Sequence, residues 1–311
     1  MKKTYFSEFM LFLAAFFWGT SFIAQRQAMD NLTPLAYLGI RFVLGALLLL
    51  PFAIARAKKA FSLAQNPARE RRLYLKGCLA AGSVLFVASC LQQYGLVFTT
   101  AGKAGFITAL YVVLVPLILF LSGRKILAGE AIGAVLAVVG LYLLSFNESM
   151  QLSTGDALVL VGAFAWSGHV LALGHFAPKI DAVVLGTGQA LVCGLIGLIL
   201  AVGLGQMPDM TALSDSWVQI LWGSVLSVTC GFTLQVVGQR GANPVVAAII
   251  LQLEAVIAAV AGWIVLGEVM TGRMIVGALV MLAGFLISQL WTYLTGSGGK
   301  PDAGAVPGGP E

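Results

Sequence analysis

The chain has 311 residues, 59% of them hydrophobic, and carries 18 Lys and Arg against 13 Asp and Glu. Charged residues make up 10% of it, whereas a soluble domain has about 25%. So few charges cannot cover a water-facing surface, which excludes an ordinary soluble enzyme, a disordered chain and a nucleic-acid-binding protein. The composition instead predicts an integral membrane protein.

Apolar stretches long enough to cross a bilayer as a helix, about 20 residues, recur along the chain. In chain order, the ten predicted spans are Phe9–Ala28, Pro34–Ala55, Gly77–Leu96, Ala104–Leu121, Glu130–Leu144, Asp156–Leu173, Ala182–Val202, Val218–Gln239, Pro244–Leu266 and Arg273–Tyr293. A transmembrane β-barrel is excluded, because its strands would alternate apolar and polar residues. The predicted fold class is therefore an all-α integral membrane protein.

The Lys and Arg residues divide unequally between the two sides of the membrane that these spans define. One side holds 14 of them, seven within residues 56–76, and the other side holds 3. Because cytoplasmic loops carry the excess of positive charge, we expect both termini to be cytoplasmic.

Three pairs of similar segments indicate an internal duplication. They are Ala15–Gly19 with Ala163–Ser167, Leu91–Gly95 with Leu234–Gly238, and Gly133–Gly140 with Gly277–Gly284, at offsets of 148, 143 and 144 residues. Each copy holds five predicted spans, an odd number, so the second copy should be inverted in the membrane. We expect one repeat over 1–147, its inverted partner over 148–295 and a disordered cytoplasmic tail over 296–311. Inverted repeats are typical of alternating-access transporters.

Several short motifs carry a family resemblance that covers nearly the whole chain. They are Trp18-Gly19 in the first span, Arg41 in the second, Ala101–Thr108 through Pro116 in the fourth, and Leu266-Gly267-Glu268 before the last. With these motifs the sequence resembles the drug/metabolite transporter superfamily, specifically ten-span proteins with two EamA-type domains. The resemblance implies a secondary transporter of a small metabolite or drug-like solute in a bacterial inner membrane, with export favoured over import.

Two charged residues lie at membrane depth, where a charge costs roughly 2.5–3.5 kcal/mol on insertion scales. Glu254, in the ninth span, is a candidate for binding a cation or a coupling proton, since burial favours its neutral form. The alternative is a structural carboxylate that bonds to residues of neighbouring helices, with Arg41 as one such partner. Arg41, in the second span, could hold a substrate carboxylate or form a structural ion pair.

Neutral polar and aromatic side chains within the spans complete the candidate site. His169 could shuttle protons or be a hydrogen-bond partner within the core. The other candidates, for which interhelical bonding or core packing is the alternative, are Gln92, Gln235, Gln252, Trp18, Trp166 and Tyr111. Pro116 removes a backbone hydrogen bond in the fourth span and is a hinge candidate.

The sequence lacks the motifs of nucleotide-driven pumps and of metal sites. The sequence has no G-x-x-x-x-G-K-[ST] loop for nucleotide hydrolysis and no paired spacing among its four cysteines, so we expect no cofactor and no metal. An intramembrane enzyme and a gated channel remain the alternatives to a transporter. The expected partners are a small-molecule substrate and the lipid bilayer, with protons as the candidate coupling ion. No nucleic acid is expected, and the oligomeric state is left open between monomer and homodimer.

Overall fold

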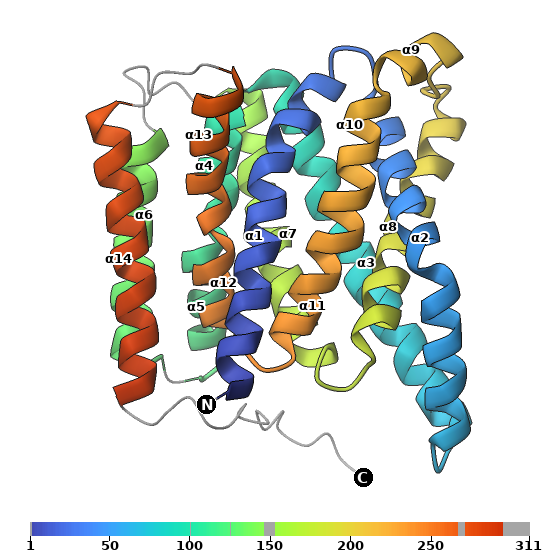
Figure 1. Ribbon diagram of the computed structural model, residues 1–311, viewed down its shortest axis with the longest axis horizontal. Helices are drawn as coiled ribbons and strands as arrows, with labels where there is room; N and C mark the ends of the chain where they lie inside the picture. Colours follow the sequence, from blue (N-terminus) through green and yellow to red (C-terminus); the bar gives the residue numbers. More distant parts are fainter. Residues whose placement is uncertain (1, 100, 125, 146–152, 267–270, 295–311) are drawn as a thin grey trace.

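The computed structural model describes residues 2–99, 101–124, 126–145, 153–266 and 271–294, and every element in this part of the chain is a helix (Figure 1). In chain order these are α1 Lys2–Ala28, α2 Pro34–Leu63, α3 Pro67–Phe98, α4 Ala101–Ala109, α5 Tyr111–Leu121, α6 Ala128–Ser145, α7 Thr154–Phe176, α8 Ala182–Gly203, α9 Met210–Asp215, α10 Trp217–Leu221, the π-helix η1 Trp222–Phe232, α11 Thr233–Gln239, α12 Pro244–Leu251, α13 Leu253–Leu266 and α14 Gly272–Leu294. The predicted tail, 296–311, and Gly267-Glu268 lie outside the described residues.

Seven helical segments among the described residues are long and apolar enough to cross a membrane. They are Tyr5–Ala28, Pro34–Leu63, Pro67–Phe98, Thr154–Phe176, Ala182–Gly203, Trp217–Gln239 and Pro244–Ala261. Three shorter apolar helices, Ile107–Leu121, Ala128–Gly140 and Gly272–Ser288, lie at the predicted fourth, fifth and tenth spans. The all-helical architecture and these apolar segments make the protein a multi-pass membrane protein, while the count of ten spans stays a prediction.

Several helices begin with a polar capping residue followed by proline. The side chains of Thr33, Asn66 and Asn243 each accept a hydrogen bond from a backbone N–H of the first turn. Proline at the next position costs nothing, because its missing N–H would be unpaired there in any case. The basic stretch 56–76, expected to be largely a loop, is mostly helical, since α2 runs on to Leu63 and α3 begins at Pro67. Lys and Arg are good helix formers.

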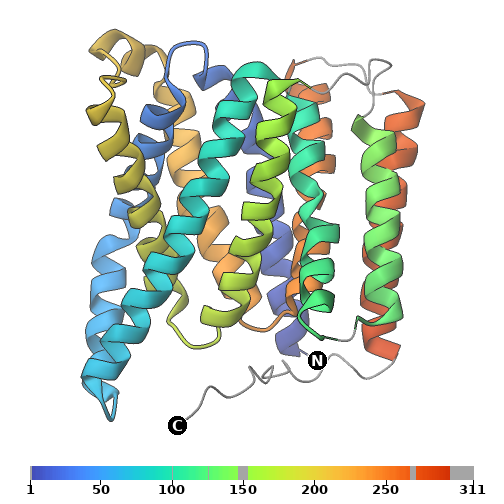
Figure 2. The same ribbon diagram turned by 180° about the vertical axis from the view of Figure 1, so that it is seen from behind.

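The helices pack into a bundle whose elements pair across the two halves of the sequence. α6 lies beside α14 at one edge, α2 packs along α8, α3 packs along α7, and α1 packs against α13 and η1 (Figures 1 and 2). α1 begins, α14 ends and α2 connects to α3 at the same end of the bundle (Figure 1). We call this the basic end, because it carries the basic stretch 56–76; α9 lies at the opposite end.

The predicted fourth and ninth spans are each interrupted in the middle. α4 ends at Ala109 and α5 starts at Tyr111, while α12 ends at Leu251 and α13 starts at Leu253. Around the first interruption, the N–H groups of Leu110 and Val113 bond to carbonyls only three residues back, at 3.2 and 3.0 Å. α5 continues through Pro116, so the interruption lies six residues before the predicted hinge. In transporters, interrupted helices in corresponding positions of two halves point to the binding site.

Candidate functional site

A cavity lies where the interrupted helices meet α1, α2, α3, α7 and η1. Its lining residues are Trp18, Phe22, Gln25, Arg41, Ser89, Gln92, Thr108, Tyr111, Trp166, Val170, Ser227, Phe232, Gln235, Leu251 and Glu254. The space open to the centres of water-sized molecules is about 40 Å³, which is room for roughly three waters. A larger solute could enter only after the surrounding helices move apart.

The structure brings seven of the nine predicted binding or coupling residues together around this cavity, the exceptions being His169 and Gln252. Most of the lining consists of residues related by the repeat offsets of 148 and 143. These pairs are Trp18 with Trp166, Phe22 with Val170, Ser89 with Phe232, Gln92 with Gln235, Thr108 with Leu251, and Tyr111 with Glu254. The sequence analysis did not select several of these lining residues, because they are apolar or small. Most of them could have been found by applying the same two offsets to the residues one helical turn away from Trp18 and Gln92.

Aromatic side chains form one wall of the cavity. The Phe232 ring lies 4.8 Å from the Trp18 ring and 6.3 Å from the Trp166 ring, measured between centroids, and is nearly parallel to the latter at 9°. The two tryptophans are held by hydrogen bonds: Trp18 Nε1 donates to the Ser227 carbonyl at 3.1 Å, and Trp166 Nε1 donates to Gln92 Oε1 at 2.9 Å. This wall is therefore both apolar and fixed in orientation.

Arg41 supplies the positive charge of the cavity. Its side chain is 3% exposed, and its guanidinium lies over the rings of Tyr37 and Phe42 at 5.1 and 5.0 Å. Within the described part of the chain no carboxylate forms an ion pair with it. Gly223 makes room here, since a Cβ atom at that position would lie 2.7 Å from the Tyr37 hydroxyl and 3.2 Å from Arg41 Cδ. Aromatic faces attract the cation but leave its charge without a counter-ion.

Glu254 supplies the acidic side chain of the cavity, in the first turn of α13 directly after the interruption. It is 6% exposed, and no described residue forms an ion pair or a hydrogen bond with its carboxylate. The pairing with Arg41 that the sequence left open is therefore not formed; the two residues line the cavity from different helices, α2 and α13. Gly19 of α1 lets α1 and α13 approach closely here, since a Cβ atom at position 19 would lie 2.6 Å from the Glu254 carbonyl oxygen.

The remaining candidates, His169, Gln252 and Pro116, do not line the cavity. His169 is fully buried, with Nε2 at 2.8 Å from Gln189 Oε1, and its ring meets the Trp166 ring edge to face at 5.8 Å. Gln252 is buried at the second interruption, with neither side-chain amide atom hydrogen-bonded within the described residues. Pro116 is buried within α5. His169 thus has a hydrogen-bond partner, Gln189, that sequence reasoning did not name.

The cavity has a definite chemical character. It presents a guanidinium from the first half of the chain, a carboxyl group from the second half, the amide side chains of Gln25, Gln92 and Gln235, and a wall of aromatic rings. Binding sites for small molecules are typically apolar with a few placed polar groups, and this arrangement fits that description.

Comparisons with known proteins agree with this architecture. The model of the EamA-like transporter family matches the chain twice, over residues 5–146 and 153–289. An uncharacterized transporter of Archaeoglobus fulgidus is 27% identical over 93% of this chain and 87% of its own length. The uncharacterized inner membrane transporter YedA of Escherichia coli is 24% identical over 84% and 83%, and YoaV of Bacillus subtilis is 23% identical over 87% and 92%.

A solved crystal structure shares the fold, with a TM-score of 0.74 and 16% identity over 93% of this chain and 98% of its own. The family model accounts for most of the sequence in two consecutive copies. It predicts a small-molecule substrate, as the geometry of the cavity does. This multi-pass membrane protein belongs to the EamA-like transporter family.

Proposed function

We propose that the protein is a secondary transporter that moves a small zwitterion with an apolar side group by alternating access. The observation that carries this proposal is the presence of Arg41 and Glu254 in one cavity without an ion pair between them. A buried charge without a counter-charge is costly. A solute carrying both a carboxylate and an ammonium group would supply both missing partners, while its side group would pack against the aromatic wall.

The positions of the two charges would also orient the substrate. The repeat offset of 148 relates Arg41 to Gln189, and the offset of 143 relates Glu254 to Tyr111. Each charged residue therefore has a neutral counterpart, and the pseudo-symmetric cavity has one positive and one negative side. A zwitterion would bind with its carboxylate toward Arg41 and its ammonium group toward Glu254.

Alternating access is supported by the two matches to the family model, the interrupted helices at the cavity and its small volume. The proposal includes ten spans arranged as inverted repeats over 1–147 and 148–295, with both termini in the cytoplasm of a bacterial cell. Export is the proposed direction, and a proton exchanging at Glu254 is the proposed coupling ion. Nothing in the cavity favours a second candidate function.

The test uses purified protein in proteoliposomes, with radiolabelled leucine, methionine and phenylalanine as zwitterionic probes. Flux should saturate and should accelerate when unlabelled substrate is present on the opposite side, as expected for a carrier. N-acetyl-leucine, which lacks the ammonium group, and leucinamide, which lacks the carboxylate, should compete at least tenfold more weakly than leucine. Each lacks one charge-assisted hydrogen bond worth about 1.5–3 kcal/mol.

Two variants assign the two ends of the substrate. Arg41→Gln should remove the discrimination against leucinamide, and Glu254→Gln should remove the discrimination against N-acetyl-leucine. Arg26→Gln is the matched control, because Arg26 is exposed and pairs with Asp30 at 3.0 Å, outside the cavity. Equal competition by all three compounds in the wild type, or flux that does not saturate, would overturn the proposal.

A further inference from the structure

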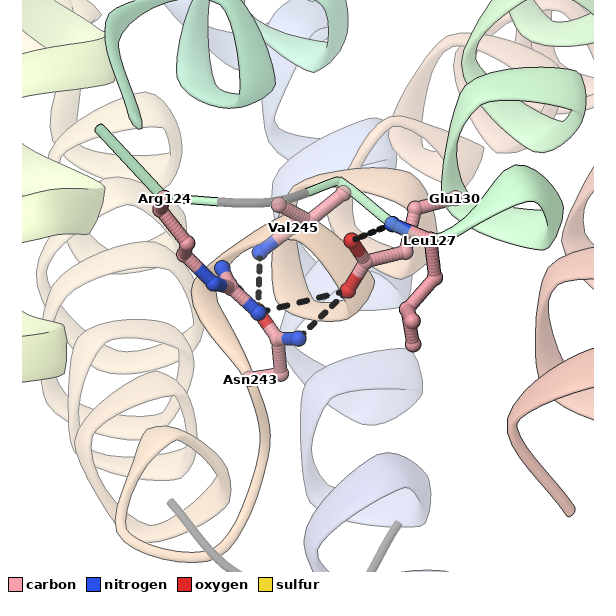
Figure 3. A network of polar contacts seen from close by, with 5 residues as sticks. All are labelled: Arg124, Leu127, Glu130, Asn243 and Val245. Carbon is pink, nitrogen blue, oxygen red and sulfur yellow. Dashed lines mark hydrogen bonds and ion pairs between the residues drawn. The ribbon is translucent and has the colours of Figure 1, made fainter. Parts of the chain in front are cut away.

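A buried polar network joins the two halves of the chain at the basic end (Figure 3). Arg124 Nη1 donates to Asn243 Oδ1 at 3.0 Å, and Arg124 Nη2 lies 3.4 Å from Glu130 Oε1. Asn243 Nδ2 also donates to Glu130 Oε1, and Glu130 Oε2 accepts the Leu127 N–H at 3.2 Å. The Glu130 side chain is fully buried and that of Arg124 is 28% exposed. The network therefore satisfies a carboxylate that has no access to water.

The three side chains come from different halves and from connections that face each other. Arg124 lies in the connection from α5 to α6 and Glu130 in the first turn of α6, both within the first family match, whereas Asn243 belongs to the second match and caps α12. Both connections lie at the basic end (Figures 1 and 2). Any movement that separates the halves at this end must break the contacts of Asn243 with Arg124 and Glu130.

α12 connects this network to the cavity. It spans only Pro244–Leu251, about 12 Å at 1.5 Å per residue, and Val245–Leu251 is buried throughout. Leu251 lines the cavity, and the interruption at Gln252 separates α12 from α13. This short helix therefore has Asn243 of the network at one end and the cavity wall and the interruption at its other end.

We propose that Arg124, Glu130 and Asn243 form a latch that holds the transporter closed at the basic end. When the latch opens, the cavity becomes accessible from that side. This inference rests on the proposed alternating access. It assigns Glu130 and Asn243 to the control of access, because neither lines the cavity. In the structure, where the latch is closed, α12 is packed against its neighbours with Ala247 fully buried.

The test measures thiol labelling in lipid nanodiscs, on a background in which the native cysteines Cys78, Cys90, Cys193 and Cys230 are replaced by alanine. Ala247→Cys reports opening at the basic end, because α12 must leave its neighbours to expose it. Gln25→Cys, in the cavity lining near the end of α1, reports the opposite side. Asn243→Asp keeps the oxygen that caps α12 and accepts from Arg124, but places a second carboxylate oxygen against Glu130.

Asn243→Asp should accelerate labelling at position 247 tenfold or more and slow it at position 25, since charge-assisted contacts to a buried carboxylate are lost. Asn66→Ala is the matched control: it removes an asparagine cap at the same end, bonded to the Arg69 N–H at 3.0 Å within one half, and should change both rates less than twofold. Unchanged rates in Asn243→Asp, equal acceleration in Asn66→Ala, or faster labelling at both reporters would overturn the latch. Leucine flux measured in parallel separates the two proposals: flux without a labelling shift removes only the latch, and a reciprocal shift without flux removes only the transport function.

Discussion

The close approach of α1 to α13 at Gly19 gives a quantitative prediction. An alanine Cβ there would lie 2.6 Å from the Glu254 carbonyl oxygen, 2.7 Å from Ile257 Cβ and 2.8 Å from Ile257 Cγ2. Neither a backbone carbonyl nor a β-carbon can rotate away, so Gly19→Ala must push the helices apart. Overpacking of this kind costs about 1–3 kcal/mol, against a gain of roughly 0.5–1 kcal/mol from the helix propensity of alanine.

Gly168→Ala is the matched control, because Gly168 lies inside α7 and its Cβ would meet only Val84 Cγ1, at an ordinary 3.6 Å. The propensity gain applies to both variants and cancels in their difference. We therefore expect Gly19→Ala to unfold with a free energy about 1–3 kcal/mol below that of Gly168→Ala. The assay is reversible unfolding in mixed detergent and SDS micelles, followed by circular dichroism. Equal free energies of unfolding for the two variants would refute the packing of α1 on α13.

Three further predictions concern the cavity and its surroundings. Trp166→Phe removes the donor to Gln92 Oε1 and should weaken leucine binding by about 0.5–1.5 kcal/mol, measured by isothermal titration; the loss should vanish in a Gln92→Leu background. His169→Leu leaves the buried Gln189 Oε1 without its partner and should lower the free energy of unfolding by about 1–3 kcal/mol, while adding Gln189→Leu should restore most of it; additive losses would contradict the pairing. Glu254→Gln should make leucine flux insensitive to an imposed pH gradient in vesicles, and unchanged sensitivity would remove Glu254 from the proton pathway.

Much of the architecture could be predicted from local sequence. Crossing a bilayer demands long apolar helices, so the interval from Ala182 to Val202 already marks a helix, which the structure extends by one residue to Gly203. The cost of a charge at membrane depth likewise singled out Arg41 and Glu254 before any contact was known, and both line the cavity. The repeat offsets related Gln92 to Gln235, which lie around that same cavity.

Other features depend on contacts between residues far apart in the chain, and the hydropathy pattern does not predict such contacts. The interruption at Gln252 has no proline beside it, and the predicted span from Pro244 to Leu266 shows no polar break other than Gln252 and Glu254. The partner of His169 is Gln189, a glutamine on the next helix. The sequence has several glutamines within predicted spans, and it does not indicate which of them bonds to His169. Only the packed helices select it.

The sequence by itself determined the membrane environment and the two charged residues within predicted spans, because each follows from the free energy of placing a single residue or segment in lipid. It also determined the duplication, because similar segments recur at nearly constant offsets. What only the tertiary structure decided was that Arg41 and Glu254 line one cavity without pairing with each other or with another described residue, and that Glu130 is instead satisfied by Arg124 and Asn243. The physical reason is that a buried charge needs a partner within a few ångströms, and which groups come that close is set by the packing of helices from both halves of the chain.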